Sequence, residues 1–138
     1  MFGVPGQLAR NYKTFEHTIK LRTRETIAKI KRERTSATII AVTGSSAKTT
    51  TVALLSHILA GHSKVTSQFL CNGYGHAIDA LLNLRSDTRY SVIEQGTKKP
   101  GHIPQAAKLL KPDLAIITLV AIEHYATLKS VEAVAQEK

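Results

Sequence analysis

A lysine and a threonine follow a short turn of small residues in the first half of this 138-residue sequence. In TIIAVTGSSAKTTTVALLSHIL, residues 38–59, a β-branched run leads into the turn 44–47, and an apolar helical segment follows Lys48 and Thr49. Such a loop points backbone N–H groups inward at a helix N-terminus, where lysine reaches nucleotide phosphates and the next hydroxyl can ligate Mg²⁺. The alternative is an ordinary strand–turn–helix whose Ser and Thr side chains cap the helix. The predicted phosphate loop consists of Thr43, Gly44, Ser45, Ser46, Ala47, Lys48, Thr49 and Thr50.

Ala47 departs from the usual phosphate-loop pattern, which has glycine before the lysine. If position 47 needs a positive φ angle, the Cβ atom of alanine costs on the order of 1–2 kcal/mol. If the position has helix-like dihedral angles, alanine costs little. Because Lys48 and Thr49 are retained in both cases, we expect nucleotide binding that is weakened rather than abolished.

Strand and helix patterns alternate along the rest of the chain. The expected strands are 37–43, 64–67, 90–94 and 114–120, and the expected helices are 49–61, 74–84, 104–111 and 130–138. Because each strand precedes a helix, the connections should be right-handed crossovers. The predicted fold class is therefore α/β, a P-loop-type parallel sheet flanked by helices in three layers. Ligands of such sheets bind at the carboxyl ends of the strands, where Glu94 and His124 are expected beside the loop.

The composition is that of one folded domain, with 43% hydrophobic and 21% charged residues. The single cysteine, Cys71, excludes an internal disulfide and favours a reducing compartment. The N-terminus lacks the apolar core of a signal peptide, and the longest apolar run, 114–122, is about half of a membrane span. We therefore expect a cytoplasmic protein with no membrane partner.

Much of the formal net charge of +9 lies near the N-terminus, where the first 38 residues carry nine Lys or Arg and three Glu. Residues 1–36 are predicted to form a basic amphipathic helix that precedes the domain of residues 37–138. One interpretation is that its apolar stripe docks the helix on the domain; the other is that the helix binds nucleic acid or an anionic membrane. We favour docking, because glutamates interrupt the basic side. The stripe consists of Leu8, Tyr12, Phe15, Ile19, Ile27 and Ile30.

Four segments carry motifs with the spacing of one known family. VTGSSAKTTT is similar to the family loop TGS(S/N)GKT(T/S) apart from Ala47, and CNGYGHAIDALLNL resembles an N-N-x-x-G helix start with Asn72 and Gly75 kept. YSVIEQGTKKPGHI resembles E-x-G-x-x-x-x-G-E-I, and residues 111–138 resemble P-D-x-A-x-x-T-N-x-x-x-x-H with a trailing S-L-E-x-x-A-x-x-K. From about residue 38 onward, the sequence therefore resembles the Mur ligase family. The positions kept in the last two segments are Glu94, Gly96, Gly101, Ile103, Pro112, Asp113, Thr118, His124, Ser130, Glu132 and Lys138.

The resemblance implies the central domain of an ATP-dependent ligase that joins a carboxylate to an amine. In this family the carboxylate attacks the γ-phosphate, which gives an acyl phosphate and ADP, and the amine then displaces phosphate. Carried over by position, Lys48 would contact the phosphates and act with His124 in catalysis. Thr49 and Glu94 would hold one Mg²⁺, and His124 would serve a second. Lys138 stands where several members have a carbamylated lysine, and it would be a metal ligand only in that form.

Each candidate also has a simpler interpretation. Glu94 could end a strand as a solvated charge, His124 could be a packed or exposed loop histidine, and Lys138 could be a frayed terminus. Because Mg²⁺ prefers oxygen ligands, Glu94 is the stronger metal candidate and His124 the weaker. Departures from the family pattern at Lys98, His102 and Leu119 bear on substrate positioning more than on the fold.

The likeness covers only the central domain, because family members also carry a sugar-nucleotide-binding domain before the loop and a C-terminal domain that brings the amino acid. We expect the sheet to be incomplete at the C-terminus, with an open edge that invites self-association or a partner chain. Three functions stay open: the ATP-binding portion of an ADP-forming ligase, a non-catalytic nucleotide-binding or interaction module derived from one, and a relative of polyglutamate-type ligases. The expected partners are ATP, Mg²⁺ and a carboxylate substrate. Nucleic acid is not expected, because a phosphate-loop protein can be basic to suit an anionic ligand.

Overall fold

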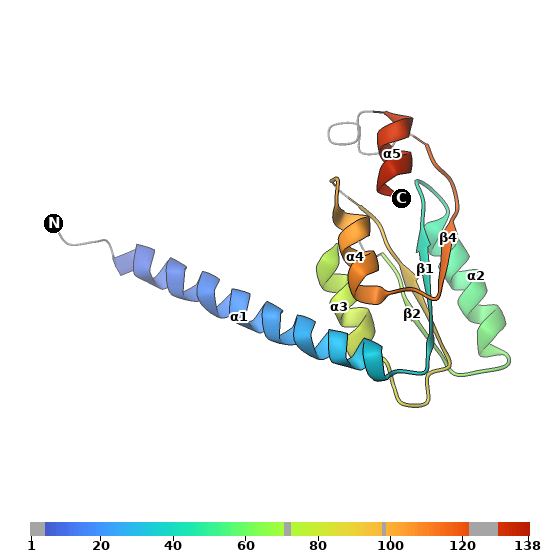
Figure 1. Cartoon of the computed structure of the whole chain (residues 1–138), viewed down its shortest axis with the longest axis horizontal. Helices are drawn as coiled ribbons and strands as arrows, with labels where there is room; N and C mark the ends of the chain where they lie inside the picture. Colours follow the sequence, from blue (N-terminus) through green and yellow to red (C-terminus); the bar gives the residue numbers. More distant parts are fainter. Residues whose placement is uncertain (1–4, 71–72, 98, 122–129) are drawn as a thin grey trace.

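In the described part of the chain, four parallel strands form a single sheet in the order β2-β3-β1-β4. The computed structural model describes residues 5–70, 73–97, 99–121 and 130–138, with the backbone alone for 5–9 and 11–13 (Figure 1). The α/β class and the parallel sheet predicted from the sequence are confirmed. The strands are β1 (Thr38–Thr43), β2 (Val65–Gln68), β3 (Tyr90–Glu94) and β4 (Leu114–Ile117). The helices are α1 (Pro5–Arg34), α2 (Lys48–Ala60), α3 (Tyr74–Leu82), α4 (His102–Leu110) and α5 (Val131–Glu137).

The sheet lies between two helical layers, as predicted (Figure 1). On one face, Val52 of α2 packs against Ile40 and Val42 of β1. On the other face, Ile39 belongs to a larger cluster with buried residues of α3, α4 and the end of α1. Neighbouring residues of β1 therefore enter different cores, which explains why the strand is a continuous apolar run. Each fully buried aliphatic side chain contributes about 1.5–3 kcal/mol relative to an exposed one.

The strand register brings the expected site residues to one edge of the sheet. Val42 of β1 is paired with Glu94 of β3, and Thr43 is paired with Ile117 of β4. The loop between β1 and α2 therefore begins beside the end of β3 and beside the segment that follows β4. This arrangement is the one expected for a ligand site at the carboxyl ends of parallel strands.

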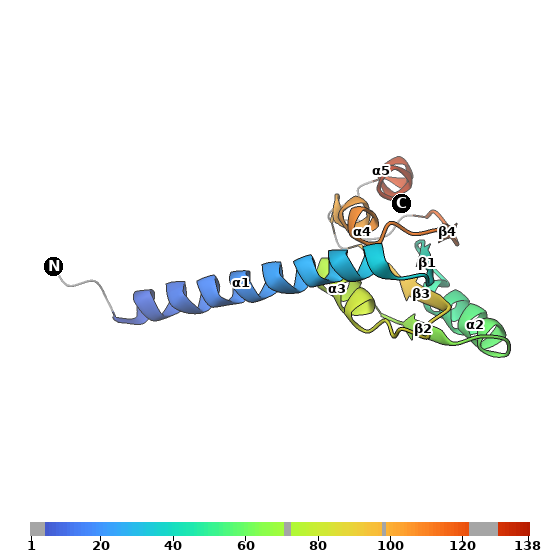
Figure 2. The ribbon, with the colours of Figure 1, turned by 60° about the horizontal axis from the view of Figure 1, so that its bottom comes forward.

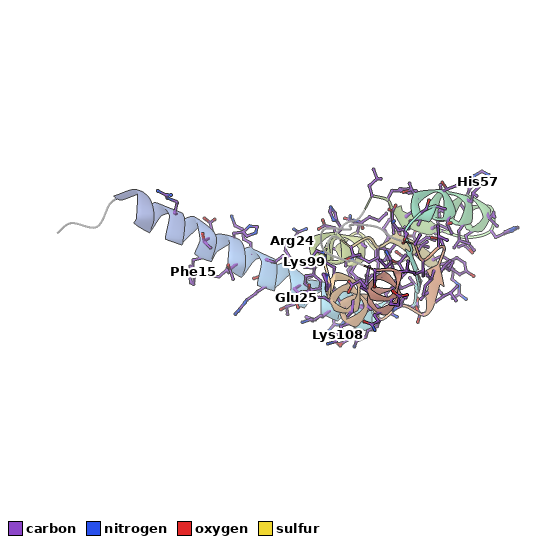
Figure 3. The ribbon with its side chains drawn as sticks, turned by 90° about the horizontal axis from the view of Figure 1, so that it is seen from above. Phe15, Arg24, Glu25, His57, Lys99 and Lys108 are labelled. Atoms are coloured by element: carbon purple, nitrogen blue, oxygen red, sulfur yellow. The ribbon has the colours of Figure 1, made fainter. Side chains whose placement is uncertain are left out.

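Helix α1 extends well beyond the domain and docks only through its C-terminal part (Figures 1 and 2). Ala28 is fully buried there, whereas Ile19 and Ile30 are 49% and 44% exposed. Successive helix residues are about 100° apart, so Ala28 and Ile30 lie about 200° apart around the axis. The helix docks, as we predicted, but the prediction that the apolar stripe forms the docked face is wrong. Phe15 lies on the protruding part (Figure 3), and the side chains of Leu8 and Tyr12 are outside the described residues.

Polar contacts rather than large apolar side chains hold α1 in place. Arg24 forms an ion pair with Asp79 of α3, and the Lys31 ammonium donates to the Leu82 carbonyl at 2.5 Å. Burial and a hydrogen bond with Glu25 raise the pKa of Tyr74 to about 12. The Tyr74 phenol therefore stays protonated well above neutral pH, and its hydrogen bond with Glu25 links α3 to α1.

Asp113 joins the end of α1 to the start of the sheet. Its carboxylate accepts the Ile39 N–H at 2.7 Å and lies 3.2 Å from the Arg32 guanidinium, which also donates to the Leu110 and Lys111 carbonyls at the end of α4. The Ile39 N–H and the charge of Arg32 lower the pKa of Asp113, although partial desolvation opposes them. One carboxylate thus connects α1, β1 and the turn before β4.

Most predicted boundaries differ from the observed ones by one or two residues, and two of the differences have a clear physical cause. The strand expected at 114–120 ends at Ile117, because residues 118–121 turn toward the loop after β1 and bond to it. The helix expected from residue 104 begins at His102, where a distant carboxylate accepts N–H groups of its first turn. None of the helices in the described part of the chain combines the length and apolarity that a membrane span requires.

Replacing Asp113 by alanine should lower the free energy of unfolding by about 1–3 kcal/mol, because the buried Ile39 N–H loses its acceptor. Urea denaturation measures this change, and Asp87→Ala is the matched control, because Asp87 is exposed and pairs only loosely with Arg85 at 3.5 Å.

The stabilisation by Asp113 should also depend on pH, because its pKa is lower in the folded state than in the unfolded chain. The stabilisation is complete above the ordinary pKa of 3.8, and it is lost as the pH falls through the lower pKa of the folded state. The difference between wild type and variant should therefore shrink between about pH 5 and about pH 2. A difference that stays constant would contradict the role of the charged form.

Candidate functional site

The loop after β1 is fastened to the segment that follows β4. The Ser45 N–H donates to the Leu119 carbonyl at 2.8 Å, and the Ser45 hydroxyl donates to the Ala121 carbonyl at 2.8 Å. The Thr118 hydroxyl donates to the Ser46 carbonyl at 2.5 Å. These contacts leave the loop little freedom, so the groups that it carries are held in place before any ligand arrives.

Gly44 is required where these two segments meet. It has a φ angle of +141°, and a Cβ atom added there would lie 2.1 Å from the Thr118 hydroxyl oxygen and 3.0 Å from the Leu119 nitrogen. Both the dihedral angle and the close approach therefore exclude a side chain. The loop glycine that the sequence retains is thus explained by a neighbour 74 residues further along the chain.

Ala47 adopts a left-handed conformation immediately before α2. Its φ and ψ angles are 60° and 8°, and its carbonyl accepts the Thr51 N–H at 2.9 Å as the first hydrogen bond of the helix. Of the two alternatives that the sequence left open, the structure supports the strained one. An alanine in this conformation costs on the order of 1–2 kcal/mol, a cost that glycine does not have.

Two lysines meet at one oxygen of the loop. The Lys48 ammonium donates to the Gly44 carbonyl at 2.7 Å, and the Lys138 ammonium donates to the same oxygen at 3.1 Å. Lys138 follows α5 directly, so the simpler interpretation of this residue as a frayed terminus does not describe its contacts. Two ammonium groups therefore lie beside the Gly44 carbonyl of the loop.

Glu94 is buried and makes directed hydrogen bonds, so it is not a solvated charge at a strand end. It is 3% exposed, and its Oε2 atom accepts the Thr49 hydroxyl at 2.8 Å and the Leu70 N–H at 3.0 Å. The Thr49 and Glu94 side chains that the sequence predicted to act together are thus in direct contact. The contribution of Leu70 was not predicted, because a backbone N–H leaves no signal in the residue type.

The other predicted residues have separate outcomes. Thr43 is buried beneath the loop, where its hydroxyl has no hydrogen-bond partner among the described residues, and it lines a cavity of about 80 Å³ that also reaches Lys138. Ser46 and Thr50 are exposed on the loop and the first turn of α2. His124 lies outside the described residues, and so do Cys71, Asn72 and Lys98.

A second buried carboxylate, Glu137, was not among the predicted site residues. It is 6% exposed and accepts the N–H groups of Gly101 and Ile103 at 2.7 and 2.8 Å. One local signal of its burial is the spacing of three residues from the apolar Val134, because residues three apart lie on the same face of a helix. Val134 is fully buried, so Glu137 lies on the buried face of α5.

Comparison with known proteins identifies the family of this domain. The Mur ligase middle domain matches residues 42–138, which is more than half of the chain. The chain belongs to the Mur ligase family. The family resemblance inferred from the motifs is therefore confirmed, and the matched Mur ligase residues begin in β1 and continue through α5.

Several relatives of this Mur ligase domain have the same enzyme name. A UDP-N-acetylmuramoyl-tripeptide–D-alanyl-D-alanine ligase of Buchnera aphidicola subsp. Baizongia pistaciae is 40% identical over 109 residues, which are 78% of this chain and 24% of that protein. The enzyme of the same name from Rickettsia prowazekii is 34% identical over 116 residues, 81% of this chain and 25% of that protein. The chain thus spans about a quarter of the length of the relatives that it matches.

Solved Mur ligase structures have the same fold. MurF from Acinetobacter baumannii matches with a TM-score of 0.79 at 27% identity, over 83% of this chain and 26% of that chain. MurF ligase from Thermotoga maritima, determined in complex with ADP, matches with a TM-score of 0.77 at 27% identity, over 85% of this chain and 28% of that chain. The three-layer arrangement around the loop is therefore a property that this Mur ligase domain shares with them.

Replacing Ala47 by glycine should leave the free energy of unfolding unchanged or raise it by up to about 1 kcal/mol. Relief of the left-handed strain stabilises the folded state, and the greater freedom of glycine in the unfolded chain offsets part of it. The matched control is Ala53→Gly on an exposed face of α2, which should lower the free energy of unfolding by about 0.5–1 kcal/mol. Urea denaturation of both variants compares them, and equal losses at the two positions would contradict a left-handed Ala47.

Proposed function

We propose that this chain binds Mg·ATP at the loop 43–50 and forms the ATP-binding portion of an ADP-forming carboxylate–amine ligase. The observation that carries the proposal is the contact between Thr49 and Glu94 beside a lysine-bearing loop at the start of α2. Lys48 has only to turn from the Gly44 carbonyl to reach a phosphate in the loop. The N-terminus of α2 adds the positive potential of the helix dipole.

The residues present suit a magnesium ion. Thr49 and Glu94 supply oxygen ligands, which Mg²⁺ prefers. Their oxygens are 2.8 Å apart, close to the roughly 2.9 Å separation of neighbouring ligands in an octahedron with Mg–O distances of about 2.0–2.1 Å. When bound, the ion would neutralise charge on the β- and γ-phosphates. Thr49 and Glu94 would hold it, and the Leu70 N–H would keep the carboxylate oriented.

The chemistry assigned to the whole ligase follows from its relatives. The relatives from Buchnera and Rickettsia are named as D-alanyl-D-alanine ligases, and the Thermotoga structure is a complex with ADP. By analogy, the carboxylate of a cell-wall precursor would attack the γ-phosphate of ATP, and an amine would then displace phosphate from the acyl phosphate. Lys48 would stabilise the charge of the transferring phosphoryl group, because phosphoryl transfer depends mainly on positioning and charge neutralisation.

Two further residues are proposed on the family pattern. His124 would serve a second Mg²⁺ and assist catalysis. Lys138 would join the metal only if it were carbamylated, because an ammonium group has no lone pair to offer a cation. In its ammonium form, Lys138 instead adds a second positive charge beside the Gly44 carbonyl.

Titration calorimetry tests nucleotide binding directly. We expect the wild-type chain to bind ATP and ADP in the presence of Mg²⁺. Ala47→Gly should bind them more tightly, because it removes a Cβ atom from a loop position that phosphate oxygens would approach. Lys48→Met should weaken the binding of Mg·ATP by about tenfold or more, the loss expected for one charge-assisted hydrogen bond. Lys64→Met, an exposed lysine at the opposite end of the sheet, is the control. Absence of binding by both the wild type and Ala47→Gly would refute the proposal.

The partner that we propose for the sheet edge is a second copy of this chain. β4 is the last strand of the described sheet and pairs with β1 on one side. Leu114 and Ile117 of this strand are 51% and 53% exposed. An apolar edge strand with unpaired backbone groups invites pairing with another strand.

Sedimentation velocity at micromolar concentration should therefore show a self-associating species. Ile117→Lys should shift the chain toward monomer, because a charge on an edge strand opposes pairing. The matched control is Leu54→Lys, which places the same charge on an exposed apolar position of α2 and should leave association unchanged. A wild-type chain that sediments as a single monomer would rule out pairing through β4.

A further inference from the structure

Glu137 holds the start of α4 although it belongs to α5. Its Oε2 atom accepts the Gly101 N–H at 2.7 Å, and its Oε1 atom accepts the Ile103 N–H at 2.8 Å. The Thr97 hydroxyl lies 3.2 Å from Oε1 and 2.7 Å from the Lys99 carbonyl, so its single proton is shared. Gly101 is the N-cap residue of α4, and the first N–H groups of a helix have no partner within it. A carboxylate from another element thus supplies the cap.

These hydrogen bonds also decide where α5 lies. The helix has seven residues, too few to be stable alone in water. Its buried face consists of Val134 and Glu137. Glu137 is 6% exposed, and burying a carboxylate costs free energy unless it accepts hydrogen bonds. The N–H groups at the start of α4 donate those hydrogen bonds, so this contact stabilises α5 in its observed position. Figures 1 and 2 show α5 next to α4, with the end of the chain close to both.

The neighbour of Glu137 in sequence is Lys138, whose ammonium group reaches the phosphate loop. Its Nζ atom lies 3.1 Å from the Gly44 carbonyl oxygen, which also accepts the Lys48 ammonium at 2.7 Å. A lysine side chain has four rotatable bonds, so a fixed position for its ammonium group requires a fixed backbone. The backbone of Lys138 is fixed by the anchored end of α5.

We propose that Glu137 is a positioning residue of the nucleotide site: by capping α4 it places α5 so that Lys138 presents its ammonium group to the phosphate loop. The part of this inference that concerns nucleotide affinity rests on the proposed function, whereas the placement of Lys138 does not. The alternative role for Glu137 is a helix cap that stabilises α4 and has no effect on the site. Two experiments distinguish these roles.

The first experiment measures the placement of Lys138 without any ligand. Reductive methylation with formaldehyde and a borohydride reagent modifies amines. Mass spectrometry gives the rate at Lys138 relative to that at Lys64, an exposed lysine at the opposite end of the sheet. In Glu137→Gln, one acceptor oxygen is replaced by an NH₂ group that faces an N–H donor, so one hydrogen bond that anchors α5 is lost. The relative methylation rate at Lys138 should then rise about fivefold, the factor that corresponds to one net hydrogen bond. Glu132→Gln, an exposed carboxylate on the same helix, should leave it unchanged. An unchanged rate in Glu137→Gln would overturn the placement role.

The second experiment measures Mg·ATP affinity by calorimetry in a double-mutant cycle. Glu137→Gln should weaken binding about fivefold when Lys138 is present and less than about twofold in a Lys138→Met background. Equal losses in the two backgrounds would overturn the proposal, and so would a loss of stability without a loss of affinity. If Glu137→Gln does not fold, a second variant tests the same contact. Thr97→Val removes the weakest of the three donors that the described residues offer Glu137, and it should give a smaller effect with the same dependence on Lys138.

The two experiments separate this inference from the proposed function. A wild-type chain that does not bind Mg·ATP would refute the proposed function, whereas the methylation rate would still decide whether Glu137 places Lys138. Conversely, binding by the wild type with no change in Glu137→Gln would leave the proposed function intact and overturn this inference.

Discussion

The parallel pairing of β1 with β3 and β4 is the constraint on which the candidate site depends. Because Val42 is opposite Glu94, the carboxylate at the end of β3 arrives next to Thr49, in the first turn of the helix that follows β1. A shift of one residue would turn Glu94 to the other face of the sheet. Pairing with β4 has a second consequence, since it brings Thr118 against Gly44 and leaves no room for a side chain there. The conformation of the loop and the contact between Thr49 and Glu94 therefore depend on the register of the sheet.

Carboxylates that accept backbone N–H groups tie distant segments to this framework. Asp113 binds Ile39, Glu94 binds Leu70, and Glu137 binds the start of α4. A carboxylate has two oxygens that only accept, and the N–H groups at the ends of strands and helices lack partners within their own element. Each such pair satisfies a group that would otherwise be costly to bury. The Glu94 contacts also orient its carboxylate beside Thr49, so at that point the stability of the fold and the geometry of the candidate site share hydrogen bonds.

Ala47 is the place where local preference and tertiary structure disagree. The two ends of the loop are fixed by β1 and α2, and the loop is bonded to the segment after β4, so the left-handed conformation is imposed on whichever residue occupies position 47. Backbone strain of this kind is found at functional sites, where the surrounding structure holds it in place. Lys48 and Thr49 keep their positions despite the strain, so the alanine affects the energy of the loop more than its geometry.

The sequence by itself determined the local features of this protein. The alternation of strands and helices, the loop with Lys48 and Thr49, and the position of Glu94 at a strand end all follow from residue types within a short window. The tertiary structure alone decided the conformation of Ala47 and the face by which α1 docks. It also decided the contacts of Leu70 and Glu137. Each of these depends on a segment more than 20 residues away along the chain, and such a partner leaves no mark in the local pattern of apolar and polar residues.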